Sequence, residues 1–208
     1  MATDRLGNLA PDMSTEEQLI AAINSELIYA HMLHQTFFTL FDSGEEVARL
    51  LEDSDEQFFS LVFSMYLDAI ALSFTRLLDP DKSVGKDNLS LFYLLERTDL
   101  RNHKEYAKWL AELQTLKGRA GKFIAVRNKV TGHLDFQTNI NLAGTPKPSF
   151  SRQDIEEVYN LIADWLNSVR AGIGTPAWVY TIGVANFQYA RPLLLRLREA
   201  KKALDRPK

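Results

Sequence analysis

An arginine, an asparagine, a glycine and a histidine lie within seven positions of one another in the segment RNKVTGHLD, residues 127–135. A neutral imidazole, whose free pKa is about 6.5, can take the proton from a ribose 2′-hydroxyl. A guanidinium can bind the phosphate and the negative charge that develops as that hydroxyl attacks phosphorus. Arg127 and His133 therefore have the side-chain chemistry to cleave RNA without a metal ion.

The spacing of Arg127 and His133 requires a helix that ends between them. Six residues of an ideal helix rotate by about 240° beyond a full turn, so side chains at this spacing point apart. Gly132 offers the end, because glycine readily adopts the left-handed conformation that closes many helices. His133 would then lie just past the helix and turn back toward Arg127. We expect Asn128 to orient the histidine or to bind phosphate.

The chain is slightly acidic, but the stretch around this motif is basic. A net charge of −3 is unusual for a general nucleic-acid binder. Residues 113–134, however, contain no Asp or Glu. We expect Arg119, Lys122 and Lys129 from this stretch to bind RNA phosphate. An ordinary solvated helix face is the alternative.

A second Arg–His pair shows that the spacing alone is weak evidence. Arg97 precedes His103 by six positions, as Arg127 precedes His133. The acidic side chain of Asp99 lies inside the first pair, whereas the second pair contains no acidic residue. The composition around Arg127 therefore distinguishes the two pairs.

Helices must position these residues. Ser14 and Glu17 have the spacing of a capping box, in which each side chain satisfies the backbone N–H of the other. The apolar residues that follow recur three or four positions apart, as on one side of an amphipathic helix: Leu19, Ile23, Leu27, Ala30, Leu33, Phe37 and Phe41. Asp42-Ser43-Gly44 should end this helix.

The most apolar segment, residues 58–78, is long enough to span a bilayer. Asp68 lies at its middle and Arg76 near its end, and each would cost about 2.5–3.5 kcal/mol at a membrane centre. We therefore expect no membrane contact and interpret the segment as a buried helix at the centre of the fold or against a partner chain. Asp79-Pro80-Asp81 should end it, because proline cannot continue the helix.

Two further helices are expected between residues 89 and 132. A short one covers residues 89–95, after a polar loop, and a longer one runs from residue 102 or 103 toward 132. Gly118 and Gly121 should bend or split the longer helix. Residues 136–150 are rich in Asn, Thr, Gly and Pro and are expected to form a loop, with at most a short strand pair.

The C-terminal part of the chain predicts two helices. Ser151-Arg152-Gln153-Asp154 resembles a helix start, and Gly172 and Gly174 should close that helix. Thr175-Pro176 suits the start of a last helix, about residues 176–205, which Pro192 should kink or divide. No linker divides the chain, so we expect a single all-α domain over residues 1–208, with its core at about 15–170.

Several other kinds of site lack support. The chain has no cysteine, which excludes disulfides and thiolate metal sites and fits a reducing, cytoplasmic location. His31 and His34 are one turn apart and could share a metal, but no acidic third ligand is near them in the sequence. We interpret that pair as a polar edge of the first helix, and we expect neither a metal nor a cofactor.

The motif RNKVTGH resembles that of HEPN domains, in which an arginine and a polar residue precede a histidine. Residues 71–91, ALSFTRLLDPDKSVGKDNLSL, are similar to the HEPN branch named after a type U abortive-infection protein (AbiU2-like). The resemblance covers residue 15 to about residue 170. It implies a HEPN-like helical bundle of about five to seven helices with a C-terminal helical extension.

The resemblance also implies an activity. Many HEPN proteins are metal-independent endoribonucleases of toxin–antitoxin or phage-defence systems, and their two motifs meet in a cleft of a homodimer. Carried onto this chain, Arg127 and His133 would be catalytic and Asn128 would support them, with RNA as substrate, a 2′,3′-cyclic phosphate as product and a cognate antitoxin protein as partner. The alternative is a non-catalytic helical module that binds RNA, a nucleotide or a protein, with Arg127 as a helix-end cation.

Overall fold

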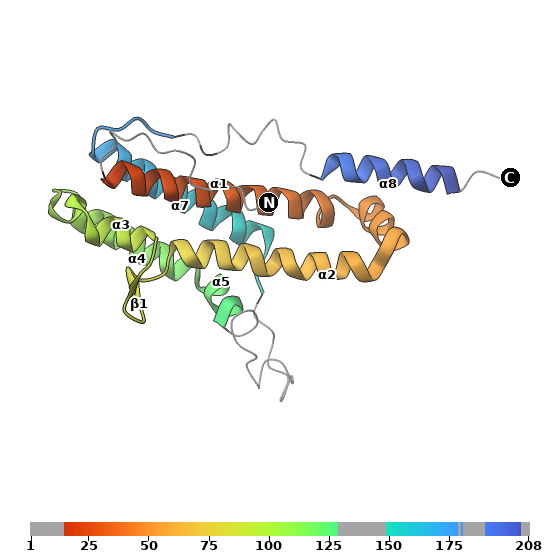
Figure 1. Ribbon diagram of the computed structural model, residues 1–208, viewed down its shortest axis with the longest axis horizontal. Helices are drawn as coiled ribbons and strands as arrows, with labels where there is room; N and C mark the ends of the chain where they lie inside the picture. The colour runs from red at the N-terminus through yellow and green to blue at the C-terminus, as the bar shows by residue number, and fades with distance from the viewer. Residues whose placement is uncertain (1–14, 129–148, 179, 181–189, 205–208) are drawn as a thin grey trace, which may run out of the picture.

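The structure, a computed structural model, describes residues 15–128, 149–178, 180 and 190–204, and nearly all of its elements are helical (Figure 1). The all-α prediction is confirmed, with seven α-helices among the described residues: α1 (Thr15–Phe41), α2 (Glu45–Leu77), α3 (Leu91–Arg97), α4 (Tyr106–Arg119), α5 (Gly121–Val126), α7 (Arg152–Gly172) and α8 (Arg191–Leu204). A 3₁₀ helix, η1 (Asp99–Asn102), and a hairpin of β1 (Lys82–Ser83) and β2 (Lys86–Asp87) complete the set.

The first helix, α1, forms as its apolar pattern predicts. Ile23, Leu27 and Ala30 of the predicted stripe are buried in the core. The helix ends at Phe41, before the predicted Asp-Ser-Gly stop. Gly44 has a φ of 95°, in the left-handed region that favours glycine. The chain can therefore reverse direction there and pack α2 against α1.

The second helix, α2, corrects the prediction of one buried helix over residues 58–78. Its C-terminal part is buried, but Phe58, Leu61 and Met65 are 54%, 60% and 60% exposed. Figure 1 shows α1 beside this part of α2, while α3, α4, α5 and α7 lie toward the C-terminal end of α2. The central burial was therefore wrong for the first half of the segment, because too few helices surround it.

A kink at Asp55 divides α2 into two helical runs, and the first of them begins at Glu45. Asp55 has non-helical angles, φ −171° and ψ 91°, and its Oδ1 accepts a hydrogen bond from the Phe58 N–H at 2.9 Å. This is the bond that an N-cap residue makes, so Asp55 begins a second helical run.

By length and composition α2 could cross a membrane, a criterion that core helices also meet.

The break between α4 and α5 confirms that the helix after residue 105 is split. It falls at Ala120, between the two glycines that predicted it, where the Ala120 N–H donates to the Leu116 carbonyl at 3.0 Å. The start at Tyr106 is later than predicted, because η1 occupies residues 99–102. The interruption redirects the chain so that α5 packs against α2.

The main hydrophobic core is formed by α1, the C-terminal part of α2, α3, α4, α5 and α7. Two tryptophans join α4 to α7 in this core. The Trp165 indole N–H donates to the Trp109 carbonyl at 2.9 Å, and the Trp109 indole N–H donates to Ser168 Oγ at 3.1 Å. Gly172 lies so close to the ring of Trp109 that an added Cβ would be 2.6 Å from its Cη2 atom. Each buried ring is thus packed and hydrogen-bonded, which fixes the position of the two helices.

One loop prediction is corrected, and a second is not tested by the described residues. The polar loop before α3 contains the antiparallel hairpin of β1 and β2, with Lys82 paired with Asp87 and Ser83 with Lys86. Gly85, with φ 75°, lies in its turn. The predicted loop at 136–150 falls almost entirely outside the described residues; Phe150 packs on Phe123 of α5.

The predicted helix from Thr175-Pro176 is wrong over the residues described there. Thr175–Trp178 form no helix, because side chains of α7 bind their backbone. Arg170 Nε–H donates to the Pro176 carbonyl at 2.7 Å, and Asn167 both donates to and accepts from the Trp178 backbone at 3.0 and 2.8 Å. Pro192 lies in the first turn of α8, where proline needs no N–H partner, so it causes no kink.

A second, smaller core lies at the far end of the α1–α2 hairpin. Its members come from α1, α2 and α8: Leu40, Val47, Leu50, Leu51, Phe59 and Leu194. Arg198 of α8 pairs with Glu46 at 3.1 Å, and Lys201 pairs with Asp53. Opposite charges therefore hold α8 along the acidic first half of α2, as its place in Figure 1 shows.

Candidate functional site

Arg127 follows the last residue of α5, and its guanidinium pairs with the carboxylate of Asp79, just past the end of α2. Nη1 lies 2.6 Å from Asp79 Oδ1, and both side chains are only 28% exposed. The packing of α5 on α2 brings these two helix ends together although 48 positions separate the residues. The predicted catalytic arginine is therefore held in place at the surface.

Asn128 contacts the same guanidinium. Its Oδ1 accepts a hydrogen bond from Arg127 Nε–H at 3.1 Å, and both residues lie in a π-helical turn. Such turns are wider than an α-helical turn and often occur at functional sites. Asn128 can thus help to orient Arg127, while its expected contact with the histidine or with phosphate stays a prediction.

Three residues of the predicted site lie outside the described residues: Lys129, Gly132 and His133. The helix end at Gly132 and the approach of His133 to Arg127 therefore stay predictions, as does the phosphate contact of Lys129.

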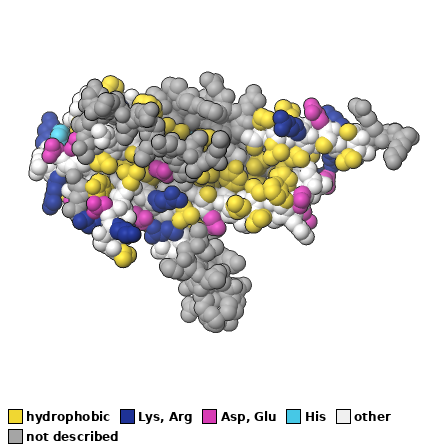
Figure 2. Space-filling model, in the orientation of Figure 1, with side chains coloured by type: hydrophobic (Ala, Val, Ile, Leu, Met, Phe, Trp, Pro, Cys, Tyr) yellow, Lys and Arg dark blue, Asp and Glu magenta, His cyan; other side chains and the backbone are white. Residues whose placement is uncertain are grey.

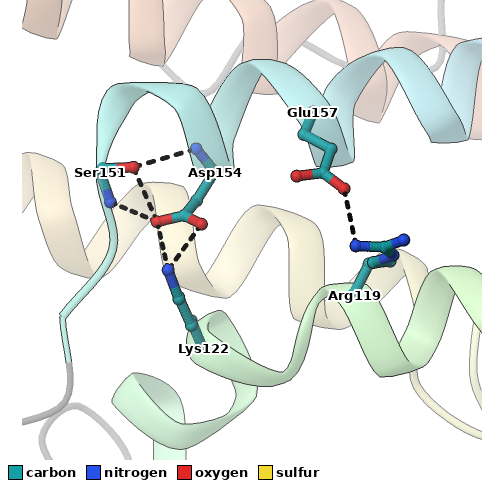
Figure 3. A network of polar contacts seen from close by, with 5 residues as sticks. All are labelled: Arg119, Lys122, Ser151, Asp154 and Glu157. Atoms are coloured by element: carbon teal, nitrogen blue, oxygen red, sulfur yellow. Dashed lines mark hydrogen bonds and ion pairs between the residues drawn. The ribbon is translucent and has the colours of Figure 1, made fainter.

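The other two predicted phosphate ligands pair with carboxylates of α7 (Figure 3). Lys122 Nζ lies 2.8 and 2.9 Å from the two carboxylate oxygens of Asp154, and Arg119 Nη1 lies 3.5 Å from Glu157 Oε1. An RNA phosphate would compete with these carboxylates, so the local positive field is weaker than the sequence suggested. RNA binding by Arg119 and Lys122 stays a prediction.

Asp154 has a structural task as well. Its carboxylate accepts from the Ser151 backbone N–H at 2.7 Å, and the Ser151 hydroxyl accepts from the Asp154 N–H at 3.2 Å, which completes the capping box of α7. The hydrogen bond from Lys122, followed by that from the Ser151 backbone, lowers the pKa of Asp154 to about 2. The predicted helix start at Ser151 is therefore confirmed.

The acidic partners are what sequence reasoning missed. Residues 113–134 contain no acid, yet Asp79, Asp154 and Glu157 reach this stretch from other helices. The sequence indicates Asp79 only as part of a helix stop. The spacing of Asp154 and Glu157, three apart on one face of α7, was the available signal for two carboxylates on the same side.

The histidines of α1 are buried, which corrects their interpretation as a polar edge. His31 and His34 are 8% and 2% exposed, with ring centroids 4.5 Å apart, and the ring of Tyr159 lies 5.0 and 5.2 Å from theirs. Burial lowers the pKa of both, that of His34 to about 3. The described part of the chain holds no group of three or more acidic or histidine side chains able to bind a metal.

His103 of the second Arg–His pair has a structural role. Its ring stacks on Trp109 at a centroid distance of 4.7 Å and an interplanar angle of 17°, and its Nδ1 accepts from the Glu105 N–H at 3.1 Å. The histidine of this pair is thus engaged in packing α4.

The helical architecture, with the motif arginine at the end of α5, is that of an all-α, HEPN-type domain. The chain matches the AbiU2 family of HEPN domains over residues 14–188 and belongs to that family, as the sequence resemblance implied. The family is linked to abortive infection and RNase activity. No curated protein and no solved structure matches the chain. Helix α8 lies beyond the matched residues.

Proposed function

We propose that the protein is a metal-independent endoribonuclease of toxin or phage-defence type. The observation that carries the proposal is the Arg127 guanidinium, which Asp79 and Asn128 hold at a helix end six positions before the motif histidine. Among the described residues, Nη2 of this guanidinium has no hydrogen-bond partner. It is available to a phosphate oxygen.

In the proposed reaction, His133 takes the proton of a ribose 2′-hydroxyl. The 2′-oxygen then bonds to the adjacent phosphorus as the bond to the 5′-oxygen breaks, which leaves a 2′,3′-cyclic phosphate and a 5′-hydroxyl. Arg127 binds the non-bridging oxygens, where negative charge grows. The departing 5′-oxygen needs a proton, which water or the imidazolium of a second copy can supply.

We propose that the protein acts as a homodimer. The exposed apolar side chains of α2, Phe58, Leu61 and Met65, support this, since a contiguous exposed apolar patch commonly marks an interaction site. Figure 2 shows hydrophobic side chains gathered over the α1–α2 hairpin. For an enzyme of this type we also propose a cognate antitoxin protein as partner and the cytoplasm as location.

The test is cleavage of total RNA by the purified protein in excess EDTA, with analysis of the fragment ends. Arg127→Ala should lower the cleavage rate by about 10²–10³, because a group that stabilises the transition state is lost. His133→Ala should lower it by about 10²–10⁴ through loss of the general base. Circular dichroism should show an unchanged helical fold in both variants.

Arg97→Ala is the matched control, because Arg97 precedes a histidine by the same six positions. It should cleave RNA at the wild-type rate. Retained cleavage in folded Arg127→Ala or His133→Ala would overturn the proposal. Binding of RNA without turnover by the wild-type dimer would instead favour the non-catalytic module.

A further inference from the structure

Asp79 provides the ionic contact of Arg127 within the described part of the chain. We infer that Asp79 is a positioning residue: its carboxylate sets the orientation in which the Arg127 guanidinium meets the phosphate. This inference rests on the proposed RNA cleavage, which assigns the guanidinium its task. Three observations support it.

First, hydrogen bonds at the C-terminal end of α2 fix the backbone of Asp79. The Asp79 N–H donates to the Arg76 carbonyl at 3.3 Å, and the preceding Leu78 N–H donates to the Thr75 carbonyl at 3.1 Å. Leu78 itself is buried in the main core. The carboxylate thus starts from a backbone whose position the helix end determines.

Second, the loop that follows Asp79 is closed on itself. Asn88 donates from its side chain to the Pro80 carbonyl at 2.8 Å and from its backbone to the Asp81 carbonyl at 2.9 Å, while its Oδ1 accepts from the Ser83 hydroxyl at 3.2 Å. The β1–β2 hairpin lies within this closed loop. The backbone is therefore hydrogen-bonded on both sides of Asp79, which suits a residue that must hold another in place.

Third, two nitrogens of the Arg127 guanidinium are hydrogen-bonded within the protein, and the third can bind phosphate. Nη1 pairs with Asp79 and Nε with Asn128, whereas Nη2 has no partner among the described residues. An arginine on a flexible stem loses rotamer freedom when it binds phosphate, and the two contacts remove part of that freedom beforehand. Asp79 thereby orients Arg127 before negative charge develops on the phosphate oxygens.

The carboxylate also has an electrostatic effect that separates this role from a purely structural one. A negative charge beside Arg127 repels a bound phosphate in the ground state. Replacing it with an amide should therefore leave substrate binding unchanged or stronger while the guanidinium loses its orientation. The expected signature is a lower kcat without a higher KM.

The kinetic test uses the full chain and a short RNA with one cleavable site. We expect Asp79→Asn to lower kcat by about tenfold or more, with KM unchanged or lower, and Asp79→Glu to restore part of kcat because the charge returns. Asp42→Asn is the matched control: it removes the carboxylate of another long-range ion pair, Asp42–Arg152 at 3.2 Å. A higher kcat in Asp79→Asn would show that Asp79 restrains Arg127 and would overturn the inference.

A second readout does not depend on activity. In ¹⁵N NMR, the heteronuclear NOE of the Arg127 Nε–H, assigned by its loss in Arg127→Lys, reports how rigid the side chain is. It should fall in Asp79→Asn and stay unchanged in Asp42→Asn. If the wild type cleaves no RNA but this NOE still falls, the proposed function fails while the positioning role stands. An unchanged NOE in Asp79→Asn would overturn the positioning role, whether or not RNA is cleaved.

Discussion

His34 is a titratable side chain in the apolar core, and its burial has a consequence for stability. In the unfolded chain a histidine binds a proton near pH 6.5, whereas burial lowers the pKa of His34 to about 3 in the folded protein. The unfolded state therefore gains a proton first as the pH falls. We expect the free energy of unfolding to be constant above about pH 7 and to fall between pH 6.5 and 3, by on the order of 1–2 kcal/mol from pH 7 to pH 5.

Urea unfolding at several pH values would measure this dependence. The variant His34→Phe, which keeps a ring beside Phe38 and Tyr159, should lose the part of the slope that His34 contributes. His31 has a pKa lowered by burial as well, so a smaller slope in the same direction should remain. An identical slope in the wild type and in His34→Phe would refute the assignment.

Between elements, the contact of α4 with α7 depends on the absence of a side chain at Gly172. A Cβ there would overlap the ring of Trp109, which is itself fixed by a hydrogen bond to Ser168. We expect Gly172→Ala to lower the free energy of unfolding by about 1–3 kcal/mol, the usual cost of overpacking. Thermal or urea unfolding would measure it.

Gly118→Ala is the control for this prediction. Gly118 is also helical, in α4, but nothing lies within 4 Å of its added Cβ. Alanine should therefore be neutral or stabilise the protein by up to about 1 kcal/mol, because it favours the helix more than glycine does. Equal effects of the two substitutions would mean that Trp109 moves aside at little cost.

The helices that the sequence predicted best are those whose signals are local. The apolar stripe of α1 and the capping box at Ser151 depend on residues a few positions apart, and both predictions were correct. The segment at Thr175-Pro176 has equally good local signals but is bound by Asn167 and Arg170 of α7. Only the packed structure shows that competition.

The residues of the candidate site likewise fall into those that local sequence signals indicate and those that only the packed structure shows. The motif itself is local, so Arg127 and Asn128 could be named from the sequence. Their partner Asp79 could not, because 48 positions separate it from Arg127 and only the packing of α5 on α2 joins them. The sequence could not predict the exposure of Phe58 and Leu61 either, because an apolar run has the same pattern whether its own chain or another chain covers it.

For the whole molecule, the exposed face of α2 predicts how the proposed dimer can be broken. Leu61→Glu or Met65→Glu would place a charge among the apolar side chains that a second copy should cover. We expect either variant to shift the mass in solution, measured by light scattering, from dimer to monomer. RNA cleavage should fall with it if the second copy completes the site.

Leu204→Glu is the control, because Leu204 is 84% exposed and lies at the end of α8. It should leave both the mass and the cleavage rate unchanged. A wild-type protein that is monomeric, or variants at Leu61 and Met65 that stay dimeric, would remove this face as the contact surface.

The two separate hydrophobic cores of the α1–α2 hairpin imply that its ends do not open together. Within the described part of the chain, α1 and α2 join the smaller core, around Leu50 and Leu194, to the main core, and Asp55 interrupts α2 beside the smaller one. Backbone amides of α8 and of residues 45–54 should therefore exchange their hydrogens with deuterium faster than those of α4 and α7. Local unfolding at that end can then proceed while Arg127 and Asp79 stay paired.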